Sequence, residues 1–132
     1  MVSLQDVTTR LGQLGFDVPA GEDSAVQFEL DWVLDYIVNY CNFSSRDEIP
    51  NLLDKRIIDR VCGEYLFKQQ KAGNLEGFDY DAFVKTIKEG DTQIQFSGSA
   101  DGETPESRFI DLCNRLERGF DKWLCHYRKL RW

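Results

Sequence analysis

Apolar residues recur every three or four positions along four stretches of this 132-residue chain, and that spacing predicts amphipathic helices. We place these helices at about residues 4–14, 23–41, 50–71 and 105–127. A chain of this length with 42% hydrophobic residues can bury one core without a metal or a disulfide. We therefore predict a single mainly α domain over residues 1–132, built as a small bundle of about four helices.

Capping residues support the starts of three of these helices. Ser3 and Asp6 have the spacing of a capping box, with Asp in place of the usual Glu. Pro50 suits a first helical turn, and Thr104 followed by Pro105 is typical of an N-cap and the position after it.

Two helices carry side chains that could serve a core or an interface. Trp32, Tyr36 and Tyr40 form a stripe at four-residue spacing, and aromatic side chains with polar tips suit both settings. On the third helix, Arg60 and Glu64 lie on the side away from the apolar rows.

The stretch 84–97 departs from the helical pattern. Residues 84–88 are rich in β-branched side chains, and Gln93–Phe96 alternate polar and apolar residues as a half-buried strand does. Glu89–Asp91 form a turn signal around Gly90. We predict an inserted β-hairpin or long loop before the last helix. A lone hairpin is marginally stable, so it lies on its own helices or pairs with another subunit.

Charge is distributed unevenly along the chain. Residues 1–107 hold 9 Lys or Arg and 20 Asp or Glu, a net of −11, whereas residues 108–132 hold 7 and 3, a net of +4. A basic end on an acidic body suggests contacts between opposite charges of two chains, although ordinary charge mixing on a solvated helix face is the alternative. The total of −7 argues against a nucleic-acid binder that works by overall basicity.

The sequence contains no pattern of residues that is typical of catalysis or of a metal site. His126 and Cys125 are neighbours on a predicted helix and point about 100° apart, which does not suit one metal ion. Asp79 and Asp81 lack the rest of a calcium loop. We expect no enzyme activity, no cofactor and no metal site. The cysteines form no CxxC pair and, without a signal peptide, fit a reducing cytoplasm; they are Cys41, Cys62, Cys113 and Cys125.

Three stretches together resemble the head–tail connector (adaptor, or head-completion) proteins of long-tailed phages and prophages. They are Ile49–Leu53 at the opening of a long helix, Ile87–Phe96 in the predicted hairpin, and the ending Tyr127–Trp132. Their order and the length of the chain are similar too.

The resemblance implies a structural virion protein that forms a ring beneath the portal, with the portal's twelve-fold symmetry. Such a ring extends the DNA channel, lets phage DNA pass without sequence-specific binding, and gives the stopper or tail a platform. The chain would be made in the bacterial host cytoplasm and would act at the head–tail interface of the virion, with no membrane involved.

The excursion 84–97 would embrace neighbouring subunits, because exposed strand edges favour pairing with another chain. The predicted subunit-interface residues are Ile87, Gly90, Asp91, Ile94 and Phe96.

The basic tail 127–132 is predicted to bind the portal, since Arg, Tyr and Trp dominate interface hot spots. The predicted portal-binding residues are Tyr127, Arg128, Leu130, Arg131 and Trp132. The alternative is that Leu130 and Trp132 fold back onto the bundle.

Acidic residues on solvent-facing helix sides are candidates for lining the DNA path, namely Asp31, Asp35 and Asp59.

Two other functions stay open. One is a small helical protein-interaction module or regulator without a virion role. The other is a nucleic-acid binder that uses the C-terminal Arg and Trp residues.

Overall fold

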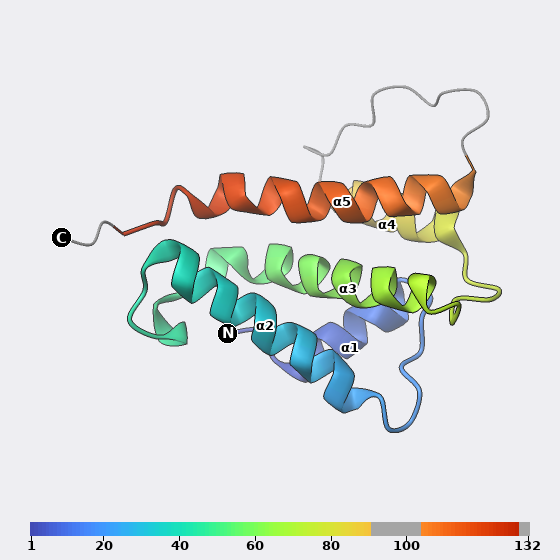
Figure 1. Cartoon of the computed structure of the whole chain (residues 1–132), viewed down its shortest axis with the longest axis horizontal. Helices are drawn as coiled ribbons and strands as arrows, with labels where there is room; N and C mark the ends of the chain where they lie inside the picture. Colours follow the sequence, from blue (N-terminus) through green and yellow to red (C-terminus); the bar gives the residue numbers. More distant parts are fainter. Residues whose placement is uncertain (91–103, 130–132) are drawn as a thin grey trace.

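The computed structural model describes residues 1–90 and 104–129. Within these ranges the chain forms five α-helices and two short 3₁₀ turns (Figure 1). The elements are α1 (Leu4–Gln13), α2 (Asp23–Cys41), η1 (Arg46–Glu48), η2 (Asn51–Leu53), α3 (Asp54–Lys71), α4 (Tyr80–Gly90) and α5 (Pro105–Leu124). The prediction of a mainly helical bundle is confirmed, and none of the described helices is long and apolar enough to cross a membrane.

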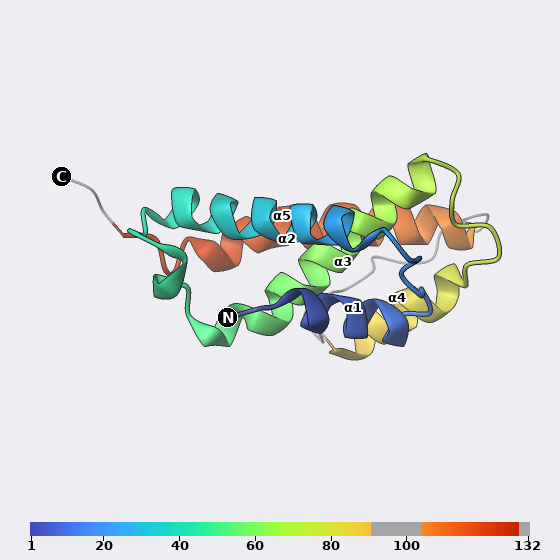
Figure 2. The ribbon, with the colours of Figure 1, turned by 90° about the horizontal axis from the view of Figure 1, so that it is seen from below.

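Helix α3 is the centre of the bundle. It contacts α1, α2 and α5, and α4 packs against α5. Figures 1 and 2 show α3 between these neighbours in both views. The core takes two fully buried side chains from each of the five helices: Val7, Leu11, Val33, Ile37, Ile57, Val61, Phe83, Ile87, Phe109 and Leu112.

The helix starts follow the capping residues. The Ser3 hydroxyl accepts from the Asp6 amide, and the Asp6 carboxylate accepts from the Ser3 amide at 2.9 Å, which completes the predicted capping box. Thr104 caps α5 by accepting from the backbone of Ser107, with Pro105 as the first helical residue. Pro50 precedes the 3₁₀ turn η2, so α3 begins four residues later than the proline indicated.

The prediction of a first hairpin strand is wrong, because residues 84–88 lie inside α4. Phe83, Val84 and Ile87 are buried and have the i, i+1, i+4 spacing of one helix face. The helix starts after Asp79, whose carboxylate accepts from the Ala82 amide at 3.0 Å. The second predicted strand, Gln93–Phe96, lies outside the described residues.

Aromatic packing explains why this segment is a helix. The ring of Phe109 on α5 lies 5.0 Å from the rings of both Tyr80 and Phe83, and 6.0 Å from that of Phe78. A helix brings the side chains at 80 and 83 to one side, whereas a strand would separate them. Burial against α5 therefore outweighs the modest strand preference of β-branched residues.

Candidate functional site

The C-terminal segment is attached to the end of α2. The backbone amide of Lys129 donates to the Cys41 carbonyl at 2.8 Å, and the Asn42 side-chain amide donates to the Lys129 carbonyl at 2.7 Å. The Lys129 ammonium lies 2.9 Å from a Glu48 carboxylate oxygen. We call this set of contacts the C-terminal anchor. It joins segments that are more than 80 residues apart in sequence.

Local backbone geometry prepares the acceptor side of the anchor. Asn42 ends α2 in the left-handed conformation, with φ of 59°, which asparagine tolerates better than most residues. The chain therefore turns away and exposes the last carbonyl of α2 to Lys129. Glu48 is oriented by the Ser44 amide, which donates to it at 2.6 Å. The hydrogen bond from Lys129 and then that from Ser44 lower the pKa of Glu48.

Two predicted portal-binding residues also contact the chain's own bundle. Tyr127 is half-buried and packs against the core, and the Arg128 guanidinium lies 5.4 Å from the centre of the Tyr40 ring. As far as Lys129, the tail thus contacts its own bundle, whereas the fold-back alternative concerned Leu130 and Trp132. Leu130, Arg131 and Trp132 lie outside the described residues.

The predicted subunit-interface residues do not form one described surface. Ile87 is fully buried in the chain's own core, so its side chain is not available to a neighbouring subunit. Gly90 is the last residue of α4. Asp91, Ile94 and Phe96 lie outside the described residues.

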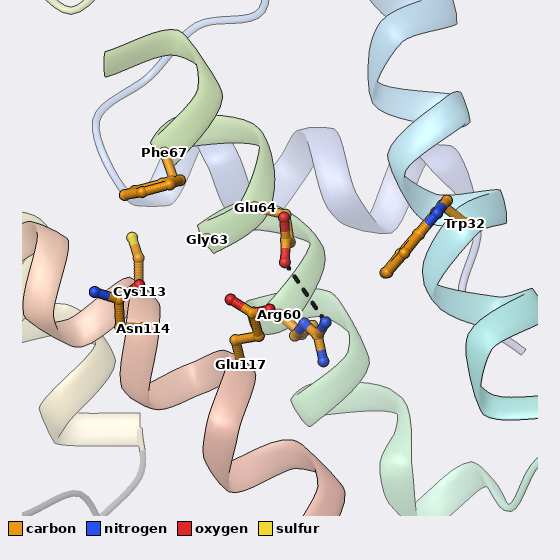
Figure 3. Close-up of a pocket in the computed structure, with 8 residues that line it drawn as sticks. All are labelled: Trp32, Arg60, Gly63, Glu64, Phe67, Cys113, Asn114 and Glu117. Atoms are coloured by element: carbon orange, nitrogen blue, oxygen red, sulfur yellow. Dashed lines mark hydrogen bonds and ion pairs between the residues drawn. The ribbon is translucent and has the colours of Figure 1, made fainter. Parts of the chain in front are cut away.

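A groove opens where α2 diverges from α3 and α5 (Figure 3). It has a volume of about 170 Å³. We call it the α2–α3–α5 groove; its lining residues are Trp32, Arg60, Gly63, Glu64, Phe67, Cys113, Asn114 and Glu117.

Arg60 is the most unusual residue of this groove. It is only 4% exposed, and its Nη2 lies 3.5 Å from a Glu64 carboxylate oxygen, at the limit of a hydrogen bond. Its Nε and Nη1 have no hydrogen-bond partner among the described residues. The guanidinium lies against the rings of Phe120 and Tyr36, at 4.9 and 5.7 Å from their centres. Ring contacts only partly offset the loss of water around a buried charge, so this site favours an added acceptor.

A hydrogen bond joins α2 to α5 near the groove. The Tyr36 hydroxyl donates to the Asp121 carboxylate at 2.7 Å. Burial, followed by this hydrogen bond, raises the pKa of Tyr36 to about 12. Tyr36 also stacks between the rings of Trp32 and Tyr40, with centres 5.7 and 5.9 Å away. Trp32, which lines the groove, is 49% exposed.

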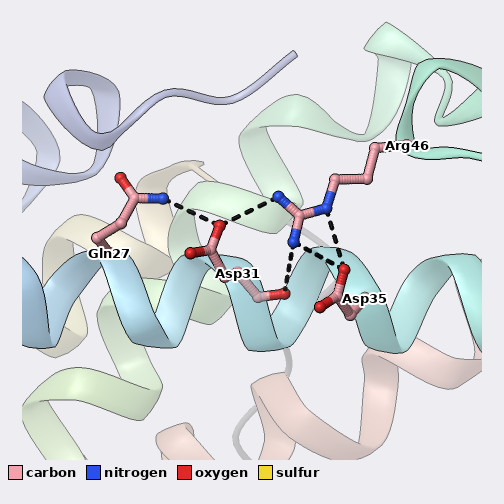
Figure 4. Close-up of polar contacts among 4 residues, drawn as sticks. All are labelled: Gln27, Asp31, Asp35 and Arg46. Carbon is pink, nitrogen blue, oxygen red and sulfur yellow. Dashed lines mark hydrogen bonds and ion pairs between the residues drawn. The ribbon is translucent and has the colours of Figure 1, made fainter.

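The acidic residues predicted to line the DNA path, Asp31, Asp35 and Asp59, are paired with arginines of the same chain. Arg46 bridges Asp31 at 3.1 Å and Asp35 at 2.7 Å, which fixes η1 against α2 (Figure 4). Hydrogen bonding to Asp35, opposed in part by burial and aided by the bond to Asp31, raises the pKa of Arg46. Asp59 lies 2.9 Å from Arg10. These three acids therefore present less uncompensated negative charge than the sequence indicated.

Metal ligands do not gather anywhere in residues 1–90 or 104–129. His126 is exposed beside Trp123, with ring centres 6.3 Å apart. Cys41, Cys62 and Cys113 are buried, and Cys125 is exposed; all four are free thiols. Burial raises the pKa of the Cys62 and Cys113 thiols, so neither is a ready nucleophile.

Sequence reasoning missed the burial of Arg60. It lies three residues after Ile57 and one before Val61, both buried, so its side chain borders the apolar face rather than opposing it. Trp32 was assigned to an aromatic stripe that could belong to the core or to an interface. It is 49% exposed, which suits an interface better than a core. Phe28, one turn earlier and 63% exposed, carried the same four-residue spacing.

Comparison of the chain with models of known protein families, with curated proteins and with solved structures finds no match.

Proposed function

We propose that this chain is a structural virion protein, a ring-forming head–tail connector that docks beneath a phage portal. The observation that carries the proposal is the C-terminal anchor. It fixes Lys129 to α2 and η1, so the basic and aromatic residues that follow start from one defined point on the bundle. A docking segment that starts from a fixed point loses less entropy on binding than one on a free tail.

Charge is consistent with this role. The residues before 108 carry a net charge of −11, which disfavours tight binding of phosphate as DNA passes. The tail after Lys129 adds Arg131 and Trp132, residue types that often form binding hot spots. In this proposal Leu130, Arg131 and Trp132 bind the portal, whereas Tyr127 and Arg128 mainly hold the segment in place.

The test compares two forms of the chain with the portal protein from the same genome. The full chain and a chain that ends at Lys129 are each mixed with portal rings, and the complexes are examined by electron microscopy and by co-sedimentation. The shorter chain keeps the anchor, so we expect unchanged helical content and melting but weaker portal binding. A loss of about 2 kcal/mol or more corresponds to one hot-spot residue.

Portal binding at full strength without residues 130–132 would contradict the docking role of the tail. Failure of the full chain to bind any portal would contradict the connector function itself. A separate variant, Ile94→Asp with Phe96→Asp, tests the excursion. It is expected to leave helical content unchanged and to prevent ring formation on the portal.

A second function, a helical protein-interaction module without a virion role, is favoured by the α2–α3–α5 groove. The groove joins an exposed Trp32 to a buried arginine that has unused donors. A partner retained by the full chain in the absence of any phage structural protein, and lost on Trp32→Ala, would favour this function.

A further inference from the structure

Leu52 is the most exposed of the large apolar side chains in the described residues. It lies in η2, just before α3, and is 85% exposed. Its neighbour Asn51 is exposed, and so is Lys55 one helical turn later. An isolated exposed leucine is ordinary, but here an exposed amide and an exposed ammonium lie within three residues of it at the start of α3.

The α2–α3–α5 groove has complementary chemistry. Trp32 and Phe67 line it with apolar side chains, and Glu117 and Glu64 add two carboxylates, of which that of Glu64 is paired with Arg60 (Figure 3). Below them, two buried nitrogen atoms of Arg60, Nε and Nη1, have no hydrogen-bond partner among the described residues. The groove therefore fits an apolar side chain that is flanked by a cation.

The groove of a given copy is not filled by its own Leu52, because that side chain is exposed. Gly63 on the groove floor lies about 14 Å along the axis of α3 from Asp54, where the helix begins. The two surfaces are thus separate on one molecule, so a head-to-tail contact between copies can use both.

We propose that Leu52 of one copy inserts into the α2–α3–α5 groove of the next copy. Lys55 then faces Glu117 and Glu64. The contact is heterologous, so each copy uses its Leu52 surface and its groove toward different neighbours. Such a contact builds rings or open chains and not closed dimers. It rests on the proposed ring-forming function and names the surfaces that would join the subunits.

Sedimentation of the full chain up to about 1 mM, where contacts with millimolar dissociation constants are half occupied, tests the proposal. We expect the average mass of the natural chain to rise with concentration. Leu52→Asp, which spoils one surface, and Trp32→Glu, which spoils the other, should each weaken self-association roughly tenfold or more. Phe28→Asp is the matched control, since Phe28 is exposed on α2 but does not line the groove.

Mixing the two defective variants gives the sharpest outcome. The Trp32→Glu copy keeps a working Leu52, and the Leu52→Asp copy keeps a working groove. Their mixture should form dimers and nothing larger. Lys55→Glu should weaken association, Glu117→Lys in the same chain should restore part of it, and Lys85→Glu, an exposed lysine of α4, should have no effect.

Three results would overturn the proposal: a natural chain that stays monomeric at about 1 mM, a Leu52→Asp chain that associates normally, or a mixture that grows beyond dimers. None of these results bears on portal binding by the tail. The connector function could therefore survive with other subunit contacts, and its own failure would appear in the portal experiment.

Discussion

Removal of Lys129 should destabilise the bundle, whereas removal of only the residues after it should not. The comparison uses a chain that ends at Arg128 and a chain that ends at Lys129. The longer form keeps the Lys129 amide on the Cys41 carbonyl and keeps an acceptor for the Asn42 side chain. The shorter form loses both hydrogen bonds and leaves Cys41 and Asn42 to bond with water; it also loses the exposed Lys129–Glu48 ion pair, which contributes little because water screens it.

The expected magnitude follows from these two bonds. A neutral hydrogen bond contributes about 0.5–1.5 kcal/mol net, and the bond from Asn42 is at the surface, where water replaces it readily. We therefore expect the free energy of unfolding to fall by about 1.5 kcal/mol between the two truncated chains, with a lower Tm by roughly 5–7 °C for a domain of this size.

Urea unfolding followed by circular dichroism measures the difference. The midpoint should move while the slope with denaturant stays constant, because the two chains expose nearly the same surface on unfolding. Equal free energies of unfolding for the two truncated chains would refute the anchor as a stabilising contact. A large loss already in the chain ending at Lys129 would instead show that residues 130–132 pack on the bundle.

Three further predictions concern the core, the titration of one tyrosine and one glycine. Phe109→Ala should lower the free energy of unfolding by about 3–5 kcal/mol in urea unfolding, while the exposed Phe28→Ala should change it by less than about 0.5 kcal/mol; similar losses for both would contradict the packing described. Because the folded pKa of Tyr36 is raised from 10.0 to about 12, its stabilising effect is complete below pH 10 and is lost as the pH rises toward 12. Tyr36→Phe should remove that part of the alkaline loss of stability, and an unchanged pH profile would count against the shift. Gly63→Ala should raise the Tm slightly and increase the free energy of unfolding by less than about 1 kcal/mol. The higher helix propensity of alanine should outweigh the close contact of its Cβ, at 3.1 Å, with the flexible end of Leu116.

Much of the helical framework could be predicted from the sequence because its signals are local. The capping box at Ser3 and Asp6 and the cap at Thr104 involve residues three positions apart, and the structure contains both. Apolar spacing located α2 and α3 to within a few residues of their ends. These features need no knowledge of what packs against them.

The segment 84–88 was mispredicted because two local signals competed. Its β-branched residues favour a strand, whereas the spacing of Phe83, Val84 and Ile87 favours a helix. The choice is made by Phe109, which lies on another helix and supplies the aromatic surface that buries this face. The sequence of residues 84–88 alone does not predict that contact.

The candidate surfaces depend even more on distant contacts. Lys129 was one basic residue in a basic tail until Cys41 and Glu48 were seen beside it. Arg60 was assigned to the side away from the apolar rows, and only the placement of Phe120 and Tyr36 over it explains its burial. The exposure of Leu52 likewise depends on how η2 is oriented at the start of α3.

The C-terminal anchor also has a consequence for the order of folding. It joins Cys41 to Lys129, so the loop that it closes includes α3, α4 and α5. Closing so long a loop is entropically costly before the intervening helices have docked. The anchor should therefore form after the transition state. Loss of Lys129 should then accelerate unfolding and leave the refolding rate almost unchanged, which makes the anchor a determinant of how long the folded bundle persists.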